Sequence, residues 1–200
     1  MVYRNFFFRA IFSFFLISIY LTINYINFEL VYYLILVIYF LIFIEIIYYF
    51  KEYKIIPSIY VLISFIFFYI IDFNEEMYLN FNLYIFSVAS FDIFSYLIGK
   101  LFGSHKLIRI SPNKTIEGFF GGFLISIFLS FSLAFFLGMD LGIYLVLFIV
   151  TIILSSFLGD IIESYFKRKN NLKNSSEYVP GHGGVFDRFD SFLFSIIFYS

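Results

Sequence analysis

The sequence has no cysteine among its 200 residues, so disulfide bonds and thiolate metal sites are excluded, and the redox compartment stays open. Charged residues make up only 14% of the chain, about half their usual share in globular domains. Alanine is confined to Ala10, Ala89 and Ala134. The net charge of −1 gives no reason to expect nucleic acid or another acidic polymer as a partner.

Apolar and aromatic side chains fill the chain instead. Apolar residues reach 62%, phenylalanine and tyrosine number 34 and 18, and the mean hydropathy is +0.95. A core can absorb only part of so much apolar surface, so the remainder must face lipid. The composition therefore excludes a cytosolic enzyme, a nucleic-acid binder and a disordered chain.

Long apolar runs predict the number of membrane spans, because a helix needs about 20 apolar residues to cross a bilayer. The predicted spans are Phe6–Thr22, Leu30–Tyr49, Ile55–Ile71, Phe81–Gly99, Gly118–Gly138, Leu141–Gly159 and a short last run, Phe189–Ser200. Residues 24–27 after the first run do not form a small-residue cleavage site, so we expect a retained helix. The sequence predicts an all-α, polytopic membrane protein with about seven transmembrane helices.

The positive charges predict the orientation of these spans. All thirteen lie on one side of the predicted membrane, two at the N-terminus and the others in alternate connections: Arg4, Arg9, Lys51, Lys54, Lys100, Lys106, Arg109, Lys114, Lys167, Arg168, Lys169, Lys173 and Arg188. The remaining connections carry acids and no Lys or Arg. By the positive-inside rule the basic side is cytoplasmic, which places the N-terminus inside and predicts a multi-pass protein of the inner (plasma) membrane.

Two of the cytoplasmic connections, 100–117 and 163–188, are too long and too polar to be simple connectors. They contain both histidines, His105 and His182, and most of the polar side chains. We therefore expect residues 1–80 to form a lipid-embedded scaffold and residues 81–200 to form a catalytic region. Basic loops that only set topology and contact anionic lipid headgroups are the alternative.

Carboxylates recur at helical spacing beside these loops. Ser156, Gly159, Asp160, Glu163 and Lys167 fall on one face of a helix. Asp187 and Asp190 are three residues apart at the start of the last run. If the two helices face each other, four carboxylates converge, and such oxygen clusters suit Mg²⁺ together with substrate phosphates. The alternative assigns Asp187 to an N-cap and Asp190 to a favourable charge at a helix start.

Three further features concern the membrane-embedded polar residues and the glycines. Asp92 lies inside a span, which makes it a functional candidate, while Glu45 has only apolar and tyrosine neighbours and stays unassigned. Small residues recur every four positions at Gly118, Gly122, Ser126 and Ser130, which predicts a helix face that packs closely against another helix.

The glycines around His182, including Gly183 and Gly184, predict a loop in front of a helix whose backbone amides can approach an anion.

The segment from Ser164 to Ser191, SYFKRKNNLKNSSEYVPGHGGVFDRFDS, closely resembles the signature of phosphatidate cytidylyltransferases, also called CDP-diacylglycerol synthases. A second stretch, from Asp92 to Gly118, is similar to another part of the same family. The matching positions are Ser164, Lys167, Arg168, Lys173, His182, Gly183, Gly184, Asp187, Arg188 and Asp190, with Asp92, Tyr96, Gly99, Phe102, Gly103, His105, Lys106, Ser111, Pro112, Lys114, Thr115, Glu117 and Gly118 upstream. The resemblance covers about the C-terminal half of the chain.

The resemblance implies transfer of CMP from CTP to phosphatidate in the cytoplasmic leaflet, giving CDP-diacylglycerol and pyrophosphate. It implies Mg²⁺, with room for a second monovalent or divalent cation. The first-choice metal ligands are Asp160 and Asp187, with Glu163 and Asp190 as further candidates. The implied catalytic residues are Asp160, Lys167, Arg168, Lys173, Asp187 and Arg188. The implied substrate-binding residues are Lys106, Lys114, His182, Gly183, Gly184 and Asp92. Membrane lipids are expected partners, nucleic acid is not, and a homodimer stays open.

Two departures from the family pattern keep alternatives open. Asn174 stands where the family has an aspartate after Lys173, and the chain is expected to lack N-terminal helices and part of the C-terminal one. An inactive homologue is therefore one alternative. Others are a CTP-using polyprenol kinase or a CDP-archaeol-type synthase, which differ in the lipid, and a secondary transporter or channel that uses Asp92.

Overall fold

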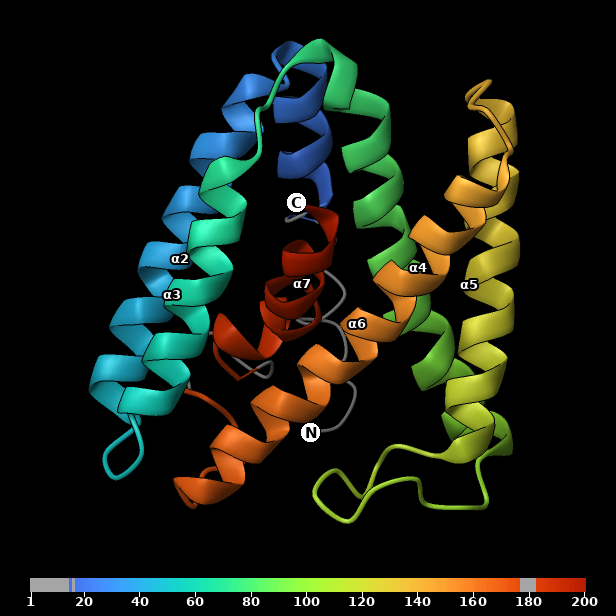
Figure 1. The fold of residues 1–200 in the computed structure, drawn as a ribbon. Helices are drawn as coiled ribbons and strands as arrows, with labels where there is room; N and C mark the ends of the chain where they lie inside the picture. The colour runs from blue at the N-terminus through green and yellow to red at the C-terminus, as the bar shows by residue number, and fades with distance from the viewer. Residues whose placement is uncertain (1–14, 16, 177–182) are drawn as a thin grey trace. The chain divides into compact units, whose positions relative to one another are not determined.

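The computed structural model describes residues 15, 17–176 and 183–200, and this part of the chain is built from helices (Figure 1). The elements are α2 (Glu29–Tyr49), α3 (Ile55–Ile70), the 3₁₀ turn η1 (Glu75–Met77), α4 (Tyr78–Phe102), α5 (Ile116–Phe136), α6 (Ile143–Lys169) and α7 (Phe186–Tyr199). A short apolar helix, Ile17–Ile26, precedes α2. The described residues form no β-strand, although one isolated bridge pairs Lys106 with Thr115.

Among the residues that the structure describes, four helical segments are long and apolar enough to cross a membrane: Glu29–Tyr49, Glu75–Phe102, Ile116–Phe136 and Ile143–Lys169. Helix α3 is equally apolar in character but shorter, at 16 residues, and α7 has 14. The predicted all-α, polytopic membrane fold is confirmed. The first predicted span, Phe6–Thr22, falls mostly outside the described residues.

Helix α7 begins three residues before the predicted last run, and two other helices continue past the C-terminal ends of their predicted spans. Helix α4 runs to Phe102, and α6 continues past Gly159 to Lys169, so that its last turn contains Lys167, Arg168 and Lys169. Apolar length measures the part of a helix that needs lipid, whereas backbone hydrogen bonding continues wherever polar residues still favour a helix. The acidic stripe predicted after Ser156 therefore lies on one continuous helix.

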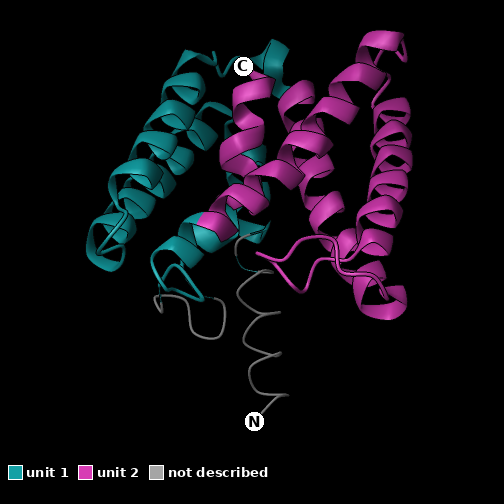
Figure 2. Cartoon of the chain, turned by 60° about the horizontal axis from the view of Figure 1, so that its bottom comes forward, with its two compact units in different colours: residues 1–78, 166–189 teal, residues 79–165, 190–200 magenta. Residues whose placement is uncertain are grey.

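The chain divides into two compact units, coloured separately in Figure 2. The first unit comprises residues 1–78 and 166–189, and the second comprises residues 79–165 and 190–200. The loop that follows α6 thus belongs to the same unit as the first 78 residues. The predicted difference in role between 1–80 and 81–200 stays a prediction.

In the first unit, α2 and α3 lie side by side (Figure 1). Helix α2 buries one face, made of Val31, Ile35, Tyr39, Ile42, Glu45 and Ile46. The hydroxyl groups of Tyr39 and Ser64 join the two helices through a buried hydrogen bond of 2.7 Å. The Tyr32 and Phe68 rings stack with their centroids 5.2 Å apart. Aromatic packing and one satisfied polar pair therefore hold this helix pair together.

In the second unit, α5 presents its small residues to α4. Gly118, Gly122, Ser126, Ser130 and Ala134 are all buried, which confirms the predicted close-packing face. A Cβ atom added to Gly122 would lie 2.7 Å from the backbone of Ser95, and Ser87 donates a hydrogen bond of 2.9 Å to Ser130. The apolar core beside this contact contains Leu83, Phe91, Ala134, Ile149 and Ile153.

Candidate active site

Three carboxylates come together in the second unit, on α6 and α7. Asp160 and Glu163 are three residues apart on α6 and share a helix face, and Asp190 lies on α7. Each contributes one oxygen to a group whose members all lie within 4.8 Å of one another. Glu163 is fully buried, and Asp160 and Asp190 are half-buried. The structure thus brings together three of the four carboxylates that the sequence spacing predicts to converge.

Gly159 allows α6 and α7 to approach closely at this group. A Cβ atom at Gly159 would lie 2.5 Å from the Asp190 carbonyl oxygen and 2.9 Å from the Phe194 Cβ atom. Only glycine leaves room for the α7 backbone at this distance. The residue beside Asp160 therefore sets the separation of the two helices that supply the acids.

Lys114 neutralises part of this acidic group. Its Nζ atom lies 2.5 Å from Asp160 Oδ2, and the two side chains are 17% and 34% exposed. The ammonium group also lies over the Phe157 ring, 5.0 Å from its centroid. Two lysines of the 100–117 loop, Lys106 and Lys114, are predicted to bind substrate. Lys114 reaches the acidic group, whereas Lys106 is exposed.

The loop that carries Lys114 is closed by short-range contacts. Leu107 N donates to Lys114 O at 2.9 Å, and Ile116 N donates to His105 O at 2.9 Å. Thr115 caps α5 by accepting from Gly118 N. Glu117 accepts from the Ser104 hydroxyl at 2.6 Å, and its carboxylate lies 2.6 Å from His105 Nδ1. These contacts account for His105 structurally and hold Lys114 in place.

Asp92, the predicted intramembrane functional acid, contacts α7 in the same unit. Its Oδ1 atom accepts a hydrogen bond of 3.0 Å from the Ser191 hydroxyl, next to Asp190. The Asp92 side chain is exposed rather than sealed in the core. Asp92 therefore supports the start of α7 within this unit, and its predicted contact with substrate stays a prediction.

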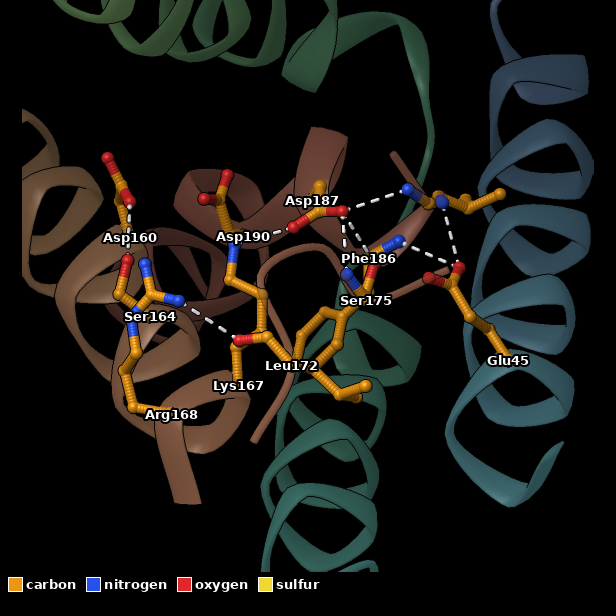
Figure 3. A network of polar contacts seen from close by, with 12 residues as sticks. Glu45, Asp160, Ser164, Lys167, Arg168, Leu172, Ser175, Phe186, Asp187 and Asp190 are labelled. Carbon is orange, nitrogen blue, oxygen red and sulfur yellow. Dashed lines mark hydrogen bonds and ion pairs between the residues drawn. The ribbon is translucent and has the colours of Figure 1, made fainter. Parts of the chain in front are cut away.

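Asp187 contacts a different set of residues, Lys167, Ser175 and Gly184, which belong to the first unit. Figure 3 shows Asp187 beside Ser175. Lys167 Nζ lies 2.5 Å from Asp187 Oδ1, and these side chains are 13% and 8% exposed. Asp187 Oδ2 accepts from Ser175 N at 2.9 Å, from Ser175 Oγ at 2.8 Å and from Gly184 N at 2.8 Å. The pair of Lys167 and Asp187 is thus well supplied with hydrogen bonds, as a nearly buried ion pair requires.

Glu45, which the sequence left unassigned, lies against the same turn. Its Oε2 atom accepts from Val185 N at 2.8 Å and from Phe186 N at 3.1 Å, and Figure 3 shows it beside Phe186. Glu45 is fully buried. One feature of the sequence does point to Glu45: it is an acid inside an apolar run, and such an acid is a functional candidate by default. Its partner, 140 residues away along the chain, has no signal in the sequence.

Gly183 and Gly184 serve the turn itself. Gly183 has a φ of +84°, which glycine adopts without strain. A Cβ atom on Gly184 would collide with Glu45 Oε1 and Ser175 Oγ. The amides of residues 184, 185 and 186 donate to the carboxylates of Asp187 and Glu45, so protein groups occupy this part of the predicted anion cradle. Contact of either glycine with substrate stays a prediction.

The remaining predicted cations differ in their surroundings. Arg168 donates to Leu172 O at 3.1 Å, which ties the end of α6 to the following loop. Lys173 and Arg188 have exposed side chains that are accessible to phosphate groups. His182 lies outside the described residues.

Mg²⁺ fits the group formed by Asp160, Glu163 and Asp190. The donors are carboxylate oxygens, which Mg²⁺ prefers, and they are close enough for one ion to contact more than one of them. Three acids at this distance repel one another unless a cation lies nearby, and Lys114 supplies one positive charge to Asp160. Asp187 belongs to the other set of contacts, within the first unit.

Comparison with known proteins agrees with the motifs in this site. The profile of the Cytidylyltransferase family matches residues 14–200. The chain is 47% identical over 105 residues to a phosphatidate cytidylyltransferase of Staphylococcus epidermidis (strain ATCC 35984), covering 52% of this chain and 40% of that protein. It is 45% and 48% identical over 138 residues to those of Staphylococcus aureus (strain COL) and Staphylococcus haemolyticus (strain JCSC1435). These matches cover 68% of this chain and 52% of each relative. The chain spans about half the length of the curated relatives it matches.

Proposed function

We propose that this chain, which belongs to the Cytidylyltransferase family, transfers CMP from CTP to phosphatidate and forms CDP-diacylglycerol and pyrophosphate. Its similarity to staphylococcal phosphatidate cytidylyltransferases supports this choice of substrates. The observation that carries the proposal is the group of Asp160, Glu163 and Asp190, with Lys114 beside it. Such a group of acids and a cation suits the handling of a nucleoside triphosphate.

In this reaction an oxygen of the phosphatidate phosphate attacks the α-phosphorus of CTP and forms a new P–O bond. The bond from that phosphorus to the oxygen bridging the α- and β-phosphates breaks, and the electron pair leaves with pyrophosphate. Both reactants are anions, so cationic side chains must bring them together. We assign Lys114, Lys167, Arg168, Lys173 and Arg188 to phosphate contacts, with Lys106, His182, Gly183 and Gly184 as further candidates. Asp92 is a candidate for contact with another part of the substrate.

Asp160, Glu163 and Asp190 are the residues that would hold Mg²⁺. When bound, the ion neutralises charge on the triphosphate and on the leaving pyrophosphate. The carboxylates of Asp160 and Glu163 share one face of a rigid helix, and Gly159 sets the approach of Asp190. The carboxylate of Asp187 is already bonded to Lys167 and Ser175. The Mg²⁺ concentration that Asp187 variants need for half-maximal turnover tests whether Asp187 also contacts the ion.

We place the reaction at the cytoplasmic face of the inner (plasma) membrane. The distribution of Lys and Arg supports this orientation, because the 100–117 and 163–188 segments contain nine of the thirteen cations: Lys100, Lys106, Arg109, Lys114, Lys167, Arg168, Lys169, Lys173 and Arg188. CTP would arrive from the cytoplasm, and phosphatidate from the cytoplasmic leaflet. A partner subunit of the same chain is an additional proposal that cross-linking in the membrane tests directly.

The test is an assay of the purified chain in vesicles that contain phosphatidate, with CTP and Mg²⁺ added. The expected result is the formation of CDP-diacylglycerol and pyrophosphate in equal amounts. Replacing phosphatidate by a polyprenol or by an archaeal-type ether lipid phosphate separates the related lipid specificities. Absence of both products with every lipid would contradict the proposal and favour an inactive homologue.

A transporter or channel that uses Asp92 is less well supported. The comparisons favour the enzyme, and Asp92 accepts a hydrogen bond from Ser191, next to an acid of the candidate site. Ion flux in the absence of CTP, abolished by Asp92→Asn, is the result that would favour this alternative.

A further inference from the structure

Glu45 is a fully buried acid that the proposed reaction does not use. It lies near the C-terminal end of α2 and is fully buried. A buried carboxylate is costly unless it accepts hydrogen bonds. Glu45 accepts two through its Oε2 atom, from Val185 N just before α7 and from Phe186 N at the first residue of α7. These amides lack partners within their own helix, and a negative charge is favourable at a helix start.

The two carboxylates, Glu45 and Asp187, divide three consecutive amides between them. Gly184 N donates to Asp187, and the next two amides donate to Glu45. The amides of residues 184–186 are therefore held by hydrogen bonds to two different carboxylates. Displacement of Glu45 would shift the backbone of this turn, which also donates a hydrogen bond to Asp187. Asp187 in turn contacts Lys167. A short chain of contacts therefore leads from α2 to a lysine of the family motif.

Packing makes this arrangement specific. Glu45 Oε1 and Ser175 Oγ occupy the space where a side chain at Gly184 would begin. The Phe186 ring packs against Phe50, just after α2, with the ring centroids 6.0 Å apart, and both residues are almost fully buried. The glycine of the motif, the acid of α2 and an aromatic pair thus fit together as one contact.

We propose that Glu45 is a positioning residue for the transfer reaction, an inference that rests on the proposed function. It fixes the turn of residues 183–186 and, through that turn, the carboxylate of Asp187 beside Lys167. Helix α2 is then part of the machinery that orients the motif, rather than part of a lipid-embedded scaffold alone.

The experiment compares Glu45→Gln with Ser64→Ala in the full 200-residue chain in phosphatidate-containing vesicles. Ser64→Ala is the matched control, because it removes another buried hydrogen bond of α2, the one with Tyr39. Glutamine keeps an acceptor oxygen but loses the charge that strengthens both bonds. Glu45→Gln is expected to lower kcat by about tenfold or more, while the KM for CTP changes by less than about threefold. Ser64→Ala should leave kcat unchanged, and Glu45→Asp, which keeps the charge, should restore part of it.

A double-mutant cycle with Asp187→Asn separates positioning from general destabilisation. If Glu45 acts through Asp187, the double variant loses little more kcat than the more impaired single variant. The proposal would be overturned if the fold-loss of kcat in the double variant equals the product of the two single losses. An unchanged kcat for Glu45→Gln in an active protein would overturn it as well.

Amide hydrogen exchange tests the contact independently of activity. Exchange at Val185 and Phe186 should accelerate by about tenfold or more in Glu45→Gln and stay unchanged in Ser64→Ala. If the native chain forms no CDP-diacylglycerol, the proposed function fails, yet this measurement still decides whether Glu45 holds the turn. Unchanged exchange at both amides would refute that role.

Discussion

At the scale of single residues, two lysine–aspartate pairs differ in what surrounds them. Asp160 pairs with Lys114 and has Glu163 and Asp190 as acidic neighbours. Asp187 pairs with Lys167 and accepts further hydrogen bonds from Ser175 and Gly184. Asp160 therefore lies in a group of three carboxylates with excess negative charge. At Asp187, by contrast, Lys167 and the hydrogen-bond donors of Ser175 and Gly184 already balance the charge of the carboxylate. A cation from solution therefore gains more at Asp160 than at Asp187.

This contrast predicts different responses to Mg²⁺. Asp160→Asn removes one charge from the acidic group, and we expect turnover to fall by about a hundredfold or more, equivalent to about 2.7 kcal/mol of barrier. We also expect the Mg²⁺ concentration for half-maximal turnover to rise. Asp187→Asn should lower turnover through loss of the Lys167 contact, with little change in that concentration. The measurement is turnover in vesicles as a function of Mg²⁺.

Asp140→Asn is the matched control, because Asp140 is an exposed acid in the connection between α5 and α6. It should behave like the native chain. Normal turnover of Asp160→Asn would remove that residue from the metal site. A large rise in the Mg²⁺ requirement of Asp187→Asn would instead assign Asp187 as a metal ligand, as the family resemblance implies.

Asn174 is the position where the chain departs from the family pattern, and its side chain is exposed. Its Cβ atom lies 3.2 Å from where a Cβ atom of Gly183 would be, so it contacts the turn. Asparagine retains an acceptor oxygen but lacks the charge of aspartate. We expect Asn174→Asp to change turnover by about tenfold or less, equivalent to about 1.4 kcal/mol. Side-by-side turnover and Mg²⁺ titration of both forms check this expectation, and recovery of activity from an inert native chain would show that the aspartate is essential.

At the scale of elements, the separation of α6 and α7 at Gly159 controls the acidic group. A methyl group at this position would meet the Asp190 carbonyl oxygen and the Phe194 Cβ atom at distances that require the helices to move apart. Gly159→Ala should therefore destabilise the protein by about 1–3 kcal/mol and weaken its Mg²⁺ response. Thermal unfolding in detergent and the same Mg²⁺ titration measure the two effects.

Gly142→Ala provides the control for Gly159→Ala. A Cβ atom at Gly142 would meet only the Asp140 carboxylate oxygens, at 3.8 and 3.9 Å, which is ordinary contact. This variant should unfold at the native temperature or slightly above it, because alanine reduces the freedom of the unfolded chain. Equal behaviour of the two variants would mean that the close approach at Gly159 is unimportant.

At the scale of the whole molecule, the absence of cysteine makes the predicted orientation directly testable. Asn113→Cys lies in the 100–117 loop at an exposed residue, and Glu76→Cys and Met139→Cys lie in connections without Lys or Arg. An impermeant thiol reagent should label Glu76→Cys and Met139→Cys from outside intact cells. Asn113→Cys should react only after the membrane is opened. Labelling of Asn113→Cys in intact cells would reverse the orientation and place the candidate site away from cytoplasmic CTP.

The sequence by itself determined the membrane class, the helical elements and the acids on one face of α6. These properties depend on composition and on spacing along one helix, where local hydrogen bonding makes residues three and four apart neighbours. The small-residue face of α5 was predictable for the same reason. Helix ends were less predictable, because α6 continues through polar residues beyond its apolar run.

Only the tertiary structure decided which distant groups meet. It placed Lys114 rather than Lys106 at Asp160, and it paired Asp187 with Lys167. It also joined Glu45 to the amides of Val185 and Phe186, a contact that no periodicity indicates. Such pairings depend on how helices pack and on which buried polar groups find partners. These are properties of the folded chain, because residues far apart in sequence become neighbours only when the helices pack.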